Sequence, residues 1–157
     1  MAVFEAAQAL EMAMRIEENG EAFYEAIAEK SDDAELAELF AELAARERAH
    51  YHVFQDMAEA TGPPSRPSRE SEIGDYGSFL QVALDHAIFE GPDKALIMAE
   101  QAHSREAALQ AAMGFEKDTL LFYYDLRELV RDADRDTISK IIAEEKQHLR
   151  QLVKLAQ

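Results

Sequence analysis

Residues 9–24 read ALEMAMRIEENGEAFY, and residues 108–123 read ALQAAMGFEKDTLLFY. At an offset of 99 positions the two stretches share an Ala-Leu pair, an Ala-Met pair, one Glu and a final Phe-Tyr pair. Farther along each copy, Glu47-x-x-His50 falls on Glu145-x-x-His148 once one residue is dropped. The chain therefore contains an internal repeat in which Glu and His recur together with apolar residues.

Four long segments rich in Ala, Leu, Glu and Met carry apolar residues at intervals of three and four, which is typical of amphipathic helices. The predicted helices are about 3–30, 32–60, 104–131 and 134–156. Short turns separate the members of each pair, with Ser31 as the expected N-cap of the second helix and residues 132–136 in that role for the fourth. Each pair is predicted to be an antiparallel helical hairpin, so the predicted fold class is all-α.

The segment between the hairpins differs in composition. Residues 61–69 contain three of the four prolines and are predicted to be a linker. Two shorter helices are predicted after it, over about 78–90 and 92–103. We therefore predict one domain over residues 1–157, a four-helix bundle with one long crossover. Its parts are hairpin 1 (about 3–60), the linker with the short helices (about 61–103) and hairpin 2 (about 104–157).

The 157 residues include 32 Asp and Glu against 16 Lys and Arg, for a formal net charge of −16, and no Cys. So acidic a chain is a poor match for nucleic acid, because phosphate binding needs clustered cations. The lack of Cys excludes disulfides, thiol catalysis and thiolate-held metal within these residues. No apolar run approaches the roughly 18 residues of a membrane-spanning helix. We expect a cytoplasmic protein that has no membrane partner.

The recurring Glu and His residues lie on the apolar faces of the predicted helices. At about 100° per residue, Glu17 lies in the middle of the stripe that contains Leu10 and Ala13. The i, i+3 spacing places each His one turn from its Glu on the same face. The residues predicted to point inward in this way are Glu17, Glu47, His50, Glu116, Glu145 and His148.

Four carboxylates in an apolar interior require positive charge, because an unpaired buried charge costs several kcal/mol or is neutralised by a large pKa rise. The nearby basic residues are predicted to face solvent and cannot supply it. Two divalent metal ions would balance the four carboxylates, with two imidazoles as neutral ligands. One Glu from each of two helices and Glu-x-x-His from each of the other two is the ligand set of di-iron and di-manganese bundles.

This pattern resembles the ferritin-like di-iron superfamily and, within it, the rubrerythrin family. The motifs that carry the likeness are Glu17-x6-Tyr24, Glu47-x-x-His50, Glu116-x6-Tyr123 and Glu145-x-x-His148. The resemblance implies that the carboxylates of the two Glu-x-x-His motifs bridge two iron ions, and that the other two glutamates and both histidines are terminal ligands. It also implies a ferritin-like bundle that reduces hydrogen peroxide.

Two features depart from the rubrerythrin pattern. Rubrerythrins draw electrons from a rubredoxin-type iron site held by four cysteines, and this chain has none. The resemblance therefore implies an external donor, such as a rubredoxin-like protein. The family also typically carries a further Glu one turn after the ligand on the third helix, where this chain has Thr119. The resulting six-residue ligand set is more symmetric and closer to bacterioferritin-type centres.

Several other polar residues lie near the predicted site. Tyr24 and Tyr123 are either large core residues or hydrogen-bond donors to a metal-binding carboxylate of the facing hairpin. His52 and His103 are predicted to be surface residues, since they lie at about 140° from the ligand face of their helices. Glu21 lies within the apolar stripe without a repeat partner and is predicted to be at the rim of the site.

The predicted function is a di-iron oxidoreductase of the rubrerythrin type, acting on hydrogen peroxide or oxygen with electrons from an external donor. Two other classes stay open: a ferroxidase or iron-storage protein, and a metal-binding bundle without turnover. Glu and His ligands also accept manganese and zinc. We expect a homodimer, in which the long linker permits exchange of hairpins between chains.

Overall fold

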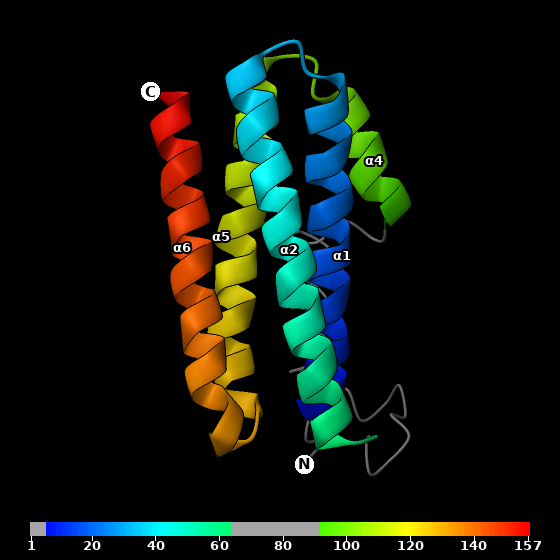
Figure 1. Ribbon diagram of the computed structural model, residues 1–157, viewed down its shortest axis with the longest axis vertical. Helices are drawn as coiled ribbons and strands as arrows, with labels where there is room; N and C mark the ends of the chain where they lie inside the picture. Colours follow the sequence, from blue (N-terminus) through cyan, green and yellow to red (C-terminus); the bar gives the residue numbers. More distant parts are fainter. Residues whose placement is uncertain (1–5, 64–91) are drawn as a thin grey trace.

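The computed structural model describes residues 6–63 and 92–157. Four long helices lie side by side (Figure 1), namely α1 (Ala6–Lys30), α2 (Ala34–Thr61), α5 (Arg105–Leu129) and α6 (Arg135–Ala156). A shorter helix, α4 (Pro92–Gln101), lies outside this group, and a 3-10 turn, η1 (Asp132–Asp134), precedes α6. All regular secondary structure in the described residues is helical. The prediction of an all-α four-helix bundle is confirmed.

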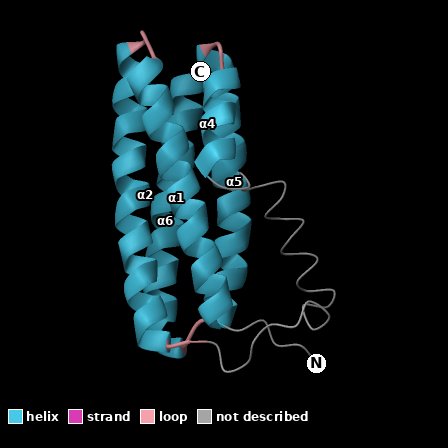
Figure 2. Ribbon diagram, turned by 90° about the vertical axis from the view of Figure 1, so that its right-hand side faces the viewer, coloured by secondary structure: helices cyan, strands magenta, loops and turns pink. Residues whose placement is uncertain are grey.

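The two hairpins pack face to face. Within them α1 packs on α2 and α5 packs on α6, and between them α1 contacts α5 and α2 contacts α6. The long helices run along the same axis, with the turns at the ends of the bundle (Figure 2). α4 packs on α1, where the Lys30 ammonium donates hydrogen bonds to the carbonyl oxygens of Ala99 and, at 3.2 Å, Ala102. The apolar stripes of all four long helices face one shared core.

The turns differ from the predicted ones in their capping. Asp33, and not Ser31, is the N-cap of α2, because its carboxylate accepts a hydrogen bond from the Leu36 amide at 3.1 Å. The Ser31 hydroxyl instead accepts from the Asp33 amide at 3.2 Å and orders the turn. Before α6 the predicted side-chain cap does not form. The Asp134 carboxylate instead accepts a hydrogen bond from Arg131 Nε at 2.9 Å.

Other predictions for the crossover have mixed outcomes. The short helix predicted over 92–103 is present as α4. The helix predicted over 78–90 and most of the linker predicted over 61–69 lie outside the described residues.

None of the helices in residues 6–63 and 92–157 combines the length and the apolar character needed to span a bilayer.

Arginine side chains join the two hairpins at both ends of the bundle. At one end Arg105 forms an ion pair with Asp33 and donates to the Leu155 carbonyl oxygen at 3.1 Å. At the other end Arg131 donates to the Ala60 carbonyl oxygen at 3.2 Å. These contacts fix the hairpins relative to each other, and with them the residues that point into the middle of the bundle.

One glycine lies at a close approach between helices. A Cβ atom at Gly20 of α1 would lie 2.9 Å from the Phe115 ring of α5 and 3.2 Å from Glu47 Oε2 of α2. Phe115 is itself buried, so its ring has little room to move. Gly114 of α5 differs, because no atom of the described residues, apart from the adjoining backbone of its own helix, lies within 4 Å of the position that its Cβ would take.

We predict opposite effects of alanine at these two glycines. Gly20→Ala should lower the free energy of unfolding by about 1–3 kcal/mol, because the added methyl group overpacks the core. Gly114→Ala should raise it by up to about 1 kcal/mol, because Ala is the better helix former. Urea denaturation followed by circular dichroism measures both. A Gly20→Ala protein as stable as the Gly114→Ala control would contradict the packing described above.

Candidate metal centre

The six inward-pointing residues predicted from the repeat meet at one place in the interior. Each lies near the middle of its helix, within the apolar stripe. The four carboxylate side chains have no exposed surface, and the two imidazoles keep only 3% and 5%. The residues are Glu17 from α1, Glu47 and His50 from α2, Glu116 from α5, and Glu145 and His148 from α6. Packing of the two hairpins is what brings them together.

The six residues form two groups that overlap. One group contains Glu17 and His50, the other contains Glu116 and His148, and Glu47 and Glu145 belong to both. In each group the ligand atoms lie within 4.8 Å of one another. This arrangement has the two-fold character of the repeat. It is the arrangement that two neighbouring cations need if they share two carboxylates.

Several ligand atoms at this place are buried and have no hydrogen-bond partner among the described residues. The unpartnered atoms are Glu17 Oε2, both carboxylate oxygens of Glu47, His50 Nδ1, Glu116 Oε2 and Glu145 Oε1. Buried polar atoms without partners are rare because each costs free energy. Oxygen and imidazole nitrogen donors that converge in this way fit hard or borderline divalent cations such as iron, manganese and zinc. The residues present therefore fit a two-metal site.

Both imidazoles face the shared carboxylate of Glu145 through Nδ1. His50 Nδ1 lies 2.9 Å from Glu145 Oε1 and 3.6 Å from Glu17 Oε1. His148 Nδ1 lies 2.9 Å from Glu145 Oε2 and 3.6 Å from Glu47 Oε1. The two rings are stacked with their centroids 5.8 Å apart. The contact between His50 and Glu145 is short but is not aligned as a hydrogen bond, so that neither atom has a hydrogen-bond partner among the described residues.

Without a cation the site favours bound protons. Burial raises the pKa of the Glu17, Glu47 and Glu116 carboxyls, and the Glu145 charge raises each of them further. Glu145 differs: burial opposes its charge as well, but its close contacts with His148 and His50 prevail and hold its pKa below the ordinary value. Burial opposes the charge on His148, yet its contacts with Glu145 and Glu47 prevail and raise its pKa to about 9.

Two buried tyrosines hold carboxylates of the facing hairpin. The Tyr24 hydroxyl of α1 donates to Glu116 Oε1 of α5 at 2.5 Å, and the Tyr123 hydroxyl of α5 donates to Glu17 Oε1 of α1. Of the two roles considered for these tyrosines, the structure thus shows the contact across the hairpins. Each bond uses one carboxylate oxygen and leaves Oε2 unpartnered toward the centre. Burial raises the pKa of both hydroxyls, which therefore stay protonated as donors.

Sequence reasoning missed one residue next to the site. Glu144 lies on α6 with its side chain half exposed, and its Oε2 lies 2.8 Å from His50 Nε2. A carboxylate at this nitrogen fixes the ring orientation and directs Nδ1 toward the centre. The repeat places Arg46 at the equivalent position of α2, so no counterpart existed to draw attention to Glu144. The only signal was its position beside Glu145.

The other polar residues considered near the site lie at the surface or the rim, as predicted. His52 and His103 are exposed, and Glu21 lies at the rim, where it accepts a hydrogen bond from Arg48 at 2.6 Å. Thr119 is fully buried one turn after Glu116, and its hydroxyl has no hydrogen-bond partner in the described part of the chain. The ligand side of α5 thus presents a hydroxyl where the resemblance would place a fifth carboxylate.

Comparison with known proteins agrees with this geometry. A family model described as rubrerythrin matches residues 8–156. A solved structure from Thermotoga maritima, described as a ferritin-like diiron-carboxylate protein, has a TM-score of 0.68 and 25% sequence identity to this chain. The match covers 99% of this chain and 97% of that one, so the ferritin-like fold is confirmed. No curated protein matches the sequence.

We predict that Glu144→Ala weakens metal binding selectively. The group that contains His50 should lose about 10- to 100-fold in affinity, because its imidazole is no longer oriented, and the group that contains His148 should change little. Stepwise titration with Co²⁺ against a competing chelator separates the two events. Glu38→Ala, at an exposed position of α2, is the control. Equal weakening of both steps would argue against an orienting role of Glu144.

The metal-free protein should lose stability as pH rises. Because the pKa of His148 is raised, this residue holds its proton in the folded state over a pH range in which the unfolded state has lost it. The stabilisation is then complete below pH 6.5 and is lost as pH rises through the folded pKa of His148, about 9. We expect a loss of about 1–3 kcal/mol over this range.

Urea denaturation in the presence of a chelator measures this loss. His52→Gln, on the surface, should keep the pH dependence, and His148→Gln should reduce it. Bound metal should flatten the dependence, because a divalent ion replaces the protons as the source of positive charge. Stability that increases between pH 6.5 and 9 in the metal-free protein would be the opposite result.

Proposed function

Because the chain belongs to the rubrerythrin family, we propose that it is a di-iron oxidoreductase that reduces hydrogen peroxide, or oxygen, with electrons from a separate donor protein. The observation that supports this proposal most directly is the pair of buried Glu/His groups that share Glu47 and Glu145. A single metal ion would leave one of the two groups without a counter-charge. Two ions balance the four carboxylates.

In this proposal each iron ion would be held by one glutamate and one histidine of its own and by two carboxylates that both groups share. The ligands are Glu17 and His50 for one ion, Glu116 and His148 for the other, and Glu47 and Glu145 for both. When bound there, the two ions supply one electron each and coordination positions at which an oxidant can bind.

The surrounding residues of this chain orient the carboxylates of the site and exclude bulk water from it. Tyr24 and Tyr123 each hold one carboxylate oxygen, so that the other oxygen stays directed inward. Complete burial of the four carboxylates excludes bulk water, which strengthens every electrostatic interaction in the site. The tyrosine protons remain on their hydroxyl oxygens, because the raised pKa values keep both groups neutral.

The electrons must be returned from outside the chain. Reduction of one hydrogen peroxide molecule consumes two electrons and two protons and yields two water molecules. The sequence has no Cys, so it contains no four-cysteine iron site of the rubredoxin type that could reduce the oxidised centre again. A separate donor such as a rubredoxin-like protein completes the cycle in this proposal.

A ferroxidase is the second candidate, and Thr119 is the residue that favours it. A hydroxyl at this position leaves a symmetric set of six ligands, as the sequence indicated for bacterioferritin-type centres. Stopped-flow oxidation of the ferrous protein separates the two functions. A faster reaction with hydrogen peroxide than with oxygen supports the peroxidase, and the reverse order supports the ferroxidase. No turnover of peroxide with a generic donor would leave only a metal-binding bundle.

We predict that the protein purifies with about two iron ions per chain and that the double variant Glu47→Ala/Glu145→Ala loses both. The two carboxylates are common to both groups, so their removal should affect both ions. Elemental analysis measures the content and distinguishes iron from manganese and zinc. Glu42→Ala/Asp136→Ala, at exposed positions of the same two helices, is the matched control. Unchanged metal content in the first variant would remove the basis of the proposal.

A further inference from the structure

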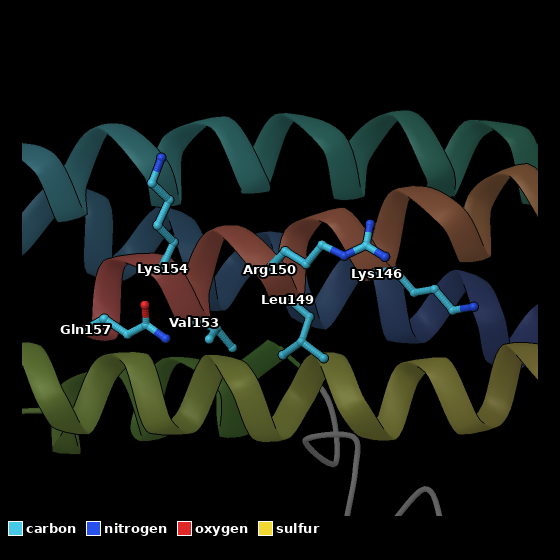
Figure 3. Close-up of a pocket in the computed structure, with 6 residues that line it drawn as sticks. All are labelled: Lys146, Leu149, Arg150, Val153, Lys154 and Gln157. Atoms are coloured by element: carbon cyan, nitrogen blue, oxygen red, sulfur yellow. The ribbon is translucent and has the colours of Figure 1, made fainter.

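The outer face of α6 carries a groove beside the candidate metal centre. It has a volume of about 450 Å³, and all its lining residues come from one stripe of the helix, namely Lys146, Leu149, Arg150, Val153, Lys154 and Gln157. We call this surface the α6 groove. Figure 3 shows Leu149 and Val153 on the side toward α5, with Lys154 extending toward α2. The Lys146 ammonium lies 5.3 Å from the centroid of the Tyr124 ring of α5.

The charge of the α6 groove is opposite to that of the chain. Residues 146–157 contain three basic and no acidic residues, whereas the whole chain has a net charge of −16. None of the three basic side chains forms an ion pair with another described residue. All three are exposed, and they border the half-buried Leu149 and the exposed Val153. The surface is thus a small apolar strip with an unneutralised basic rim.

The internal repeat provides a comparison for this surface. The equivalent face of α2 consists of Arg48, Tyr51, His52, Gln55, Asp56 and Glu59. The single arginine of this face, Arg48, contacts Glu21 at 2.6 Å and Glu25 at 2.7 Å. Toward the C-terminal end of α2 the face carries two acidic residues, Asp56 and Glu59. Residues 6–61 as a whole carry four basic and fourteen acidic residues, against nine and ten in residues 104–157. The two copies are alike in the interior and differ in charge at this outer face.

The α6 groove lies on the face of α6 next to the one that carries the ligands, because successive residues of a helix are about 100° apart. Lys146 directly follows Glu145, and Leu149 directly follows His148. A helix with its side chains is about 10–12 Å across. A redox group held in the groove would therefore be separated from the centre by one helix only.

We propose that the α6 groove is the docking surface for the electron donor, and that the donor is a small protein with an acidic rim around an apolar contact. This inference rests on the proposed function. The exposed apolar surface is much too small for a stable interface between two copies, which buries about 800 Å² on each partner. A small apolar contact with complementary charge suits a brief electron-transfer encounter, in which charge speeds association. Each encounter passes one electron, so two encounters replace the two electrons spent on one hydrogen peroxide molecule.

The test compares two charge-reversal variants of the iron-loaded protein. The groove variant is Lys146→Glu/Arg150→Glu/Lys154→Glu. The control, Arg15→Glu/Arg135→Glu/Lys140→Glu, makes the same change in net charge at exposed positions outside the groove. A third variant with Gln at the three groove positions removes the charges without reversing them. The probe is a reduced rubredoxin chosen for its acidic sequence, and a basic one-electron carrier is the comparison probe.

Stopped-flow reduction of the ferric centre gives the first result. For the parent, the second-order rate constant with the acidic rubredoxin should fall as salt is added. It should be at least tenfold lower in the groove variant and lower in the Gln variant, but unchanged in the control. Reduction by dithionite should be equal in all four proteins. Calorimetric titration with zinc-substituted rubredoxin should show at least tenfold weaker binding to the groove variant, independently of any turnover.

Three results would overturn the proposal. The groove variant could be reduced by rubredoxin as fast as the parent, or the basic carrier could react faster than the acidic one. The groove variant could also elute as a smaller species than the parent, which would identify the groove as a contact between two copies. A failure of the proposed function looks different, because the ferrous protein would then not react with peroxide or oxygen while salt-dependent reduction through the groove persisted.

Discussion

The structure depends on one electrostatic constraint, which is that four carboxylates lie in an apolar interior where charge is costly. Each comes from a different long helix, so none can be withdrawn to solvent without disrupting the bundle. The tyrosines and histidines around them satisfy part of their hydrogen-bonding capacity and leave the rest directed to common points. In the metal-free protein protons reduce the repulsion, and a pair of divalent ions does so more completely. Fold stability and metal binding are therefore two aspects of one interaction.

The repeat explains why the centre is nearly two-fold symmetric, and its exceptions show where the two copies have separate roles. Gly20 makes room for the Phe115 ring, whereas its counterpart Thr119 carries a buried hydroxyl. Glu144 orients His50, whereas the equivalent position on the first hairpin is Arg46. The outer faces of α2 and α6 differ most in charge. The symmetric interior suits the proposed metal pair, and the asymmetric exterior suits the proposed docking of a donor on one face.

Much of the site could be predicted because its residues are unusual for their position. An ionisable residue in an apolar stripe is conspicuous. Glu and His recur at equivalent positions of the stripes in the second hairpin, which argues against a chance occurrence. Glu144 and Asp33 were not predicted, because a polar residue at a helix surface or in a turn is ordinary and several neighbours could take the same role. Ser31 and Asp33 are two residues apart, and only the backbone conformation decides which of them meets the free amide of Leu36.

Four amphipathic helices, their pairing into hairpins and the six inward-pointing residues could all be predicted, because helical periodicity and the internal repeat are visible in the order of residues without knowledge of how the helices pack. The packed helices show which carboxylates both groups share, which tyrosine meets which glutamate, and that Glu144 reaches His50. These contacts join different helices, and their geometry depends on the distance and rotation between packed helices. Periodicity fixes the face on which a side chain lies, but the packing of the hairpins selects the atoms that it meets.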